Sequence, residues 1–185
     1  MILLLLADGF EETEALVPLD LLRRGKCDVK TVGITGKTVV GAHGIAVTAD
    51  LSPKEATGKI DALILPGGMP GTTNLDASRE VDRLIEKTQS DGGRLAAICA
   101  APLVLGRRGL LAGKRAVCFP GFENELKGAV ASKKRVETDG KVTTAVGMGA
   151  AYEFGLALLA LFKGKETAER VRVSSLIPDA IPIPD

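Results

Sequence analysis

The sequence predicts an α/β protein, a three-layer sandwich in which helices cover both faces of a largely parallel sheet. Short apolar runs alternate along the chain with longer segments of helical periodicity, an order typical of βαβ units. The first run, residues 2–7, is apolar throughout, as expected of a parallel strand covered on both faces. With 185 residues, 45% of them hydrophobic, the chain can bury a sizeable core, and we expect one domain over residues 1–185.

Further strands are predicted where apolar and β-branched residues form short runs: 29–34, 60–65, 95–98 and 116–118. Two small hairpins are added to them. Residues 39–40 and 45–47 flank a glycine-containing turn, and residues 135–137 and 142–145 flank Asp139-Gly140, a dipeptide that favours a tight hairpin turn.

Helical segments are predicted at 11–24, 78–90, 102–108, 147–162 and 166–175. The first helix carries acidic residues in its first turn and Arg23 and Arg24 in its last, which suits the helix dipole. Pro18 lies inside this helix and predicts a kink or an irregular turn there. The proline-rich tail, residues 177–185, is expected to be extended.

Composition and charge argue against several classes of protein. The formal net charge is +1, which does not favour a nucleic-acid or anionic membrane partner. The apolar N-terminal run lacks a positive flank and precedes acidic residues, so we interpret it as a strand rather than a signal peptide. No run approaches the roughly 18 residues of a membrane span. Cys27, Cys99 and Cys118 form neither a C-x-x-C pair nor a zinc pattern, so we expect no metal and a cytoplasmic location.

The segment around Cys99 predicts a reactive cysteine. An apolar run ends at Cys99, small residues (Ala97 and Ala101) stand two positions to either side, and a helix-forming segment follows. This is the pattern of a nucleophile elbow with cysteine in place of serine. The elbow places the sulfur at a helix N-terminus, where backbone N–H groups and the helix dipole favour the thiolate. The alternative is a buried structural cysteine.

Two other segments are expected to converge on Cys99, because sites in such sheets form beyond the carboxyl ends of the strands. In the first, residues 66–71, the small Gly67 and Gly68 let the backbone approach the sulfur, and the N–H groups of Gly68 and Ala100 are expected to form an oxyanion hole. In the second, Glu14 is expected to hydrogen-bond Cys99 and to act as its proton partner. The alternative for the glycine loop is a plain strand-to-helix turn.

His43 is the only histidine in the chain, and it lies in a predicted hairpin rather than after a core strand. A Cys-His-Asp triad would have to use this residue. Its position therefore argues against a conventional cysteine protease.

These residues resemble the ThiJ/PfpI superfamily and, within it, the DJ-one-like branch. The most specific pieces are DGFEETE at residues 8–14, LPGG at 65–68 and AICAAP at 97–102. The resemblance implies a flavodoxin-like sandwich that forms a homodimer and uses no cofactor. It also implies that Cys99 is the reactive cysteine of the family, that the protonated carboxyl of Glu14 bonds its sulfur, and that Gly68 and Ala100 supply backbone donors.

The resemblance further implies a set of residues near the pocket or the dimer interface: Gly67, Arg24, His43, Cys118, Phe119 and Met148. Arg24 matches an arginine of relatives, whereas His43 replaces another. Phe119 stands where many relatives carry histidine, and Met148 stands where the branch often has proline. Met148 is expected to make the pocket floor flexible and oxidisable.

The fold does not choose among the activities assigned to this family. The first hypothesis is a cofactor-independent glyoxalase or deglycase, in which Cys99 attacks methylglyoxal or an early glycation adduct and Glu14 transfers protons. The second is a non-enzymatic redox sensor or chaperone that works through oxidation of Cys99, with Cys118 either resolving the sulfenic acid or serving only the core. An intracellular peptidase is the third, and the absence of a suitably placed histidine disfavours it.

Overall fold

A six-stranded sheet forms the centre of the structure, a computed structural model that describes residues 1–184. In spatial order its strands are β2 (Val29–Gly33), β1 (Ile2–Leu6), β5 (Ala62–Leu65), β6 (Arg94–Ile98), β10 (Val142–Ala145) and β9 (Val136–Asp139). Neighbouring strands pair in parallel except β9 and β10, which form an antiparallel hairpin at one edge. The predicted α/β fold with a largely parallel sheet is confirmed.

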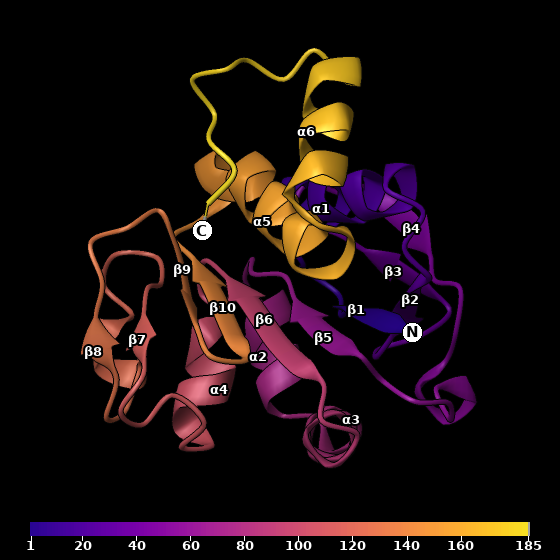
Figure 1. The fold of residues 1–185 in the computed structure, drawn as a ribbon. Helices are drawn as coiled ribbons and strands as arrows, with labels where there is room; N and C mark the ends of the chain where they lie inside the picture. Colours follow the sequence, from indigo (N-terminus) through magenta and orange to yellow (C-terminus); the bar gives the residue numbers. More distant parts are fainter. Residues whose placement is uncertain (185) are drawn as a thin grey trace.

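Helices cover both faces of this sheet (Figure 1). One face carries α1 (Glu12–Arg24) and α5 (Ala151–Lys163), with α6 (Lys165–Ser174) packed against α5. The other carries α2 (Gly71–Asp76), α3 (Arg79–Ser90) and α4 (Pro102–Arg107). None of the helices within residues 1–184 is long and apolar enough to cross a membrane.

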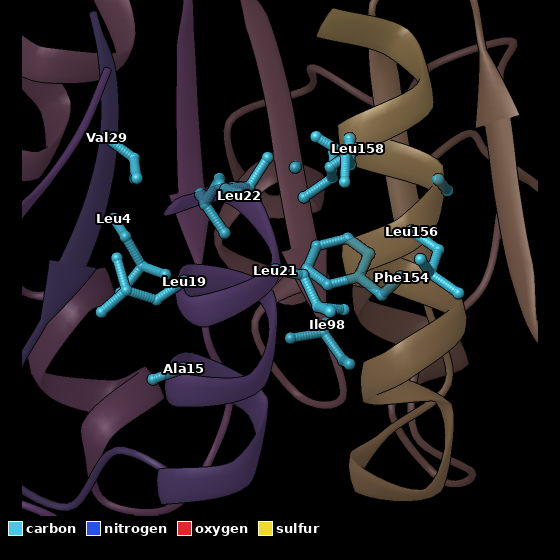
Figure 2. Close-up of a cluster of buried hydrophobic side chains, with 14 of the residues drawn as sticks. Leu4, Ala15, Leu19, Leu21, Leu22, Val29, Ile98, Phe154, Leu156 and Leu158 are labelled. Atoms are coloured by element: carbon cyan, nitrogen blue, oxygen red, sulfur yellow. The ribbon is translucent and has the colours of Figure 1, made fainter. Parts of the chain in front are cut away.

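The strand β1 supplies side chains to both halves of the core, because successive residues of a strand point to opposite faces. Leu4 packs with α1 and α5, and Leu3 packs with the helices of the opposite face; both are fully buried. Figure 2 shows the first half, where Phe154 of α5 and Leu22 of α1 fill the space above the sheet. Burial of each such side chain contributes about 1.5–3 kcal/mol, and it fixes the strand ends that carry the loops described below.

Both predicted hairpins are present. The first consists of β3 (Thr38–Val40) and β4 (Ala46–Thr48), which pair outside the main sheet. The second is the β9–β10 pair at the sheet edge. Short 3-10 turns at Pro53–Glu55, Glu123–Glu125 and Met148–Ala150 were not predicted, and neither was α2.

Two local predictions are wrong or incomplete. The strand expected at 116–118 is only β7 (Arg115–Ala116), which pairs with β8 (Val130–Ala131) outside the main sheet. The helix expected from residue 147 begins with a 3-10 turn, and α5 starts at Ala151. The helix α1 continues on both sides of Pro18, and Pro18 lies against Gly155, whose missing side chain leaves room for it; the kink expected at Pro18 stays a prediction. Residues 177–184 contain no helix or strand, while Asp185 lies outside the described residues.

Candidate functional site

Cys99 lies in a sharp turn directly after β6. Its φ angle is +65°, a left-handed conformation that side chains other than glycine rarely adopt and that costs on the order of 1–3 kcal/mol. Two hydrogen bonds hold the turn: the Cys99 N–H donates to the Ala145 carbonyl (2.9 Å), and the Cys99 carbonyl accepts from the Phe119 N–H (2.8 Å). With α4 beginning at Pro102, the segment has the strained strand-to-helix geometry of the predicted nucleophile elbow.

Glu14 is the side chain that faces this cysteine, as predicted. It lies in the first turns of α1, is 1% exposed, and its carboxyl hydrogen-bonds the Cys99 side chain. The Gly67 N–H donates to Glu14 Oε2 (3.0 Å), and the backbone N–H of Met148 donates to the same carboxyl group. The carboxyl is therefore held between two peptide donors and one thiol.

The glycine loop after β5 lies directly against this pair. A Cβ atom on Gly67 would lie 2.5 Å from Glu14 Oε2 and 2.7 Å from the Cβ of Cys99, so only glycine fits. Gly68 has a φ of +89°, and its N–H and that of Ala100 lie near enough to the Cys99 sulfur to act on the pKa of the thiol. The predicted convergence of Gly68 and Ala100 on one point is thus present in the geometry.

The acidity of the pair differs from the sequence-based expectation. Burial raises the pKa of the Cys99 thiol to about 12, the nearby Glu14 carboxylate adds to this rise, and the N–H groups of Ala100 and Gly68 act in the opposite direction. The N–H groups at the start of the helix favour the thiolate, as predicted, but burial and the neighbouring carboxylate outweigh them, so the net change in the pKa is opposite to the one expected.

Burial also raises the pKa of Glu14 to about 7, although bonds from Cys99, Gly67 and Met148 act to lower it. The two groups titrate as a coupled pair that loses its first proton near neutral pH and keeps its second. At neutral pH the Cys99–Glu14 pair therefore holds either two protons or one. This range of acidity suits a group that takes a proton from a nucleophile and returns it.

Gly147, which the sequence did not single out as a site residue, lies close to the Cys99–Glu14 pair. A Cβ atom there would lie 3.9 Å from the Cys99 sulfur, 3.8 Å from Glu14 Oε1 and 3.3 Å from the Phe119 ring. Phe119 and Met148, both predicted near the pocket, are about half exposed beside it. The signal for Gly147 was its place in Gly147-Met148-Gly149 directly after a strand, opposite the cysteine turn.

Three other predicted residues do not join the pair. Arg24 lies ten residues from Glu14 at the far end of α1, about 15 Å away along the helix axis, and bonds Asp20. Cys118 is buried in the core, where burial raises the pKa of its thiol to about 11. His43 bonds Glu12 through Nδ1 (2.9 Å) rather than Cys99. Whether Arg24 and His43 lie near a dimer partner stays a prediction.

Within residues 1–184, one group has donor atoms close enough to hold a metal ion: Glu11, Glu12 and His43, within 4.8 Å of one another. Their atoms already serve the fold. Glu11 caps α1 by accepting from the Glu14 N–H (2.7 Å), and Glu12 accepts from the backbone N–H (2.8 Å) and ring of His43. This chemistry explains the cluster without an ion.

Fold and site together define an α/β protein with a nucleophile-elbow cysteine paired to a buried carboxyl group. The DJ-1/PfpI family model matches residues 1–161, so the chain belongs to the DJ-1/PfpI family. Among curated relatives, Protein dj-1beta of Drosophila melanogaster is 35% identical over 95% of this chain and 96% of its own length.

Protein DJ-1 homolog B of Arabidopsis thaliana is 40% identical over 92% of this chain but only 40% of its own length. The chain thus spans less than half of that relative. A Caenorhabditis elegans relative named glutathione-independent glyoxalase is 31% identical over 89% of both chains.

Solved structures agree with this assignment. A DJ-1 superfamily protein from Salmonella typhimurium superimposes with a TM-score of 0.91, at 34% identity over 96% of this chain and 98% of its own. An oxidized DJ-1 from Toxoplasma gondii superimposes with a TM-score of 0.89, at 32% identity over 95% of this chain and 97% of its own.

Proposed function

We propose that this protein is a cofactor-independent glyoxalase that converts methylglyoxal into lactate at Cys99. The observation that carries the proposal is the pairing of an elbow cysteine with a buried carboxyl group whose pKa is about 7. The relative from Caenorhabditis elegans named as a glutathione-independent glyoxalase supports the same chemistry.

The first step forms a bond between the Cys99 sulfur and the aldehyde carbon of methylglyoxal. The sulfur gives its proton to ionised Glu14 as it attacks, and the aldehyde π bond opens to an oxyanion. Because the N–H groups of Gly68 and Ala100 point at the sulfur, an oxygen on the carbon bound to that sulfur lies within their reach. Glu14 then returns the proton to the oxyanion and leaves a hemithioacetal.

The second stage moves hydrogen between the two carbons. Glu14 removes the hydrogen of the former aldehyde carbon as a proton, giving an enediolate, and delivers it to the neighbouring carbon. The hydroxyl proton on the former aldehyde carbon passes to the former ketone oxygen. The aldehyde carbon is oxidised to a thioester while the ketone is reduced to an alcohol, so no external oxidant is needed. Water cleaves the thioester, releases lactate and restores the thiol. Attack on an early glycation adduct by the same sulfur would make the protein a deglycase.

The test is consumption of methylglyoxal with formation of lactate by the purified protein. Cys99→Ser should lower kcat/KM at least about a hundredfold. Cys27→Ser removes a half-buried thiol from another part of the molecule and serves as the matched control. A rate that is unchanged by Cys99→Ser would overturn the proposal.

The second candidate function is a redox sensor, favoured by the same arrangement of donors. A sulfinate on Cys99 would accept bonds from the N–H groups of Gly68 and Ala100 and share a proton with Glu14. The solved Toxoplasma gondii relative is described as oxidized. Intact mass after mild peroxide, followed by peptide mapping, tests this function, because a sensor gains oxygen at Cys99 before it does so at Cys118.

Family membership also supports a homodimer that works in a reducing cytoplasm. The three cysteines are free thiols in the structure, which suits that compartment. Light scattering would distinguish a dimer from the 19.2 kDa monomer.

A further inference from the structure

Three apolar side chains on segments that touch Cys99 or Glu14 are unusually exposed. Phe119 is 48% exposed, Met148 is 55% exposed and Met69 is 52% exposed. Each belongs to a segment that touches the reacting pair: Met69 follows Gly68, Met148 donates its N–H to Glu14, and Phe119 donates its N–H to the Cys99 carbonyl. We call these three residues the apolar rim.

Phe119 is the member of the rim whose position is best fixed. A point at the Cβ position of Gly147 is 3.3 Å from the Phe119 ring, 3.8 Å from Glu14 Oε1 and 3.9 Å from the Cys99 sulfur. The ring, the acid and the nucleophile therefore border one small space. Since the Phe119 N–H is bonded to the Cys99 carbonyl (2.8 Å), the ring stays close to the sulfur.

The charges near this space disfavour an anion. Glu14 itself and Glu11, which acts on it electrostatically, are both carboxylates. The guanidinium group of Arg135 approaches Gly149, but it is bonded to Glu153 (2.6 Å) and to the Gly149 carbonyl. Its positive charge is therefore compensated by Glu153, while an ionised Glu14 beside the sulfur disfavours a second negative charge there.

We infer that the site prefers an uncharged α-oxoaldehyde with a bulky apolar or aromatic substituent on the ketone carbon, and that Phe119 determines this preference. The substituent packs against the Phe119 ring while the aldehyde carbon faces the sulfur, since stacked or edge-on aromatic contacts and removal of apolar surface from water both favour binding. The inference rests on the proposed glyoxalase activity and specifies its substrate class.

The experiment compares kcat/KM for methylglyoxal, phenylglyoxal and 4-carboxyphenylglyoxal, with Cys99→Ser as the background for each. Phenylglyoxal should exceed methylglyoxal by about tenfold, and the added carboxylate should remove most of that advantage. Phe119→Ala should lower the ratio of phenylglyoxal to methylglyoxal by about three- to tenfold, and Phe119→Leu by less. Val130→Ala removes an exposed valine on β8 and should leave the ratio unchanged.

A variant that is expected to gain activity provides a test that does not depend on loss of activity. Met148→Lys places a cation on the apolar rim and should raise the rate for 4-carboxyphenylglyoxal relative to phenylglyoxal. The inference is wrong if methylglyoxal turns over through Cys99 but neither the aryl group, the carboxylate nor Phe119 changes the ratios. If none of the three compounds is consumed through Cys99, the proposed glyoxalase activity fails first.

Discussion

Glu12 and Glu14 lie two residues apart at the start of α1, and both are nearly inaccessible, at 6% and 1% exposure. Their acidities nevertheless move in opposite directions. Burial raises the pKa of Glu12, but bonds from the His43 ring and from the backbone N–H groups of His43 and Ile45 outweigh it, and the pKa ends below its ordinary value. For Glu14 burial prevails, and the pKa rises to about 7.

Burial alone therefore does not set the pKa of an acidic side chain. Its hydrogen-bond partners determine whether the pKa rises or falls. Residues two apart on a helix point to nearly opposite sides, roughly 160° apart, so the two carboxyl groups meet different neighbours. Glu12 meets a histidine that gains a proton readily, and the two form an ion pair. Glu14 meets a thiol that itself holds a proton tightly. One carboxylate ties a hairpin to a helix, and the other is free to exchange a proton.

The largest expected effect is on enzymatic activity, which should depend on Glu14 and not on Glu12. Glu14→Gln removes the proton acceptor for Cys99 and should lower kcat/KM for methylglyoxal by about 10²–10⁴-fold. Glu12→Gln removes the same charge two residues away and should change it less than about threefold. Equal losses in the two variants would break the comparison and would indicate a general electrostatic effect of the helix start.

The raised pKa of Glu14 also predicts how activity and stability depend on pH. Activity should rise with pH and level off above about 7, because ionised Glu14 accepts the thiol proton.

The free energy of unfolding should change in the opposite direction and fall as pH rises. The folded protein binds the Glu14 proton more tightly than the unfolded chain, whose value is 4.5, so stability falls as pH rises from about 4.5 to 7.

The size of this stability term is about 3 kcal/mol, which follows from the difference between the folded and unfolded pKa values of Glu14. Urea unfolding of the wild type and Glu14→Gln at several pH values measures it. The difference in unfolding free energy between the two proteins should shift in favour of Glu14→Gln as pH rises through this window. A constant difference would show that the Glu14 pKa is not raised.

A smaller effect is expected from Glu12 on stability. Glu12→Gln replaces the carboxylate that accepts from the His43 ring and backbone, and should lower the free energy of unfolding by about 1 kcal/mol at neutral pH. Because the pKa of Glu12 is lowered, its contribution is present above the unfolded value and is lost as pH falls. Chemical denaturation at pH 7 and at pH 4 should therefore show a narrower gap between variant and wild type at the lower pH.

The smallest effect concerns His43, whose ring is exposed. The hydrogen bond to Glu12 raises the pKa of His43 above 6.5, so its stabilising contribution is full below that value and is lost as pH rises through the raised pKa. The melting temperatures of His43→Ala and wild type should therefore differ more at pH 6 than at pH 9. Thermal unfolding that gives the same difference at both values would contradict the ion pair.

Sequence reasoning predicted the elements that obey local rules. The apolar strands, the first helix with its acidic start and the small residues around Cys99 are all visible as patterns. Glu14 was chosen as the partner of Cys99 from its place one turn into the first helix together with the family resemblance. These features could be predicted because periodicity and residue size constrain them directly.

Other properties depend on segments that meet only in the folded chain. The raised pKa of Cys99 follows from burial against Glu14, and the position of Phe119 follows from one hydrogen bond to a strand end. The close approach of α1 and α5 at Pro18 depends on Gly155, where a Cβ atom would lie 3.0 Å from the Pro18 Cα atom. No local pattern contains these facts, since each depends on how distant segments pack.

The two hydrogen bonds that hold the Cys99 turn reach to Phe119 and Ala145, 20 and 46 positions further along the chain. Contacts of such long range cost more loop-closure entropy and tend to form late in folding. A partly synthesised chain that has passed Cys99 but has not yet made β10 therefore lacks the bond from Cys99 to Ala145. The local geometry of Cys99 is complete only once β10 has joined the sheet, so the turn depends on the completion of the fold.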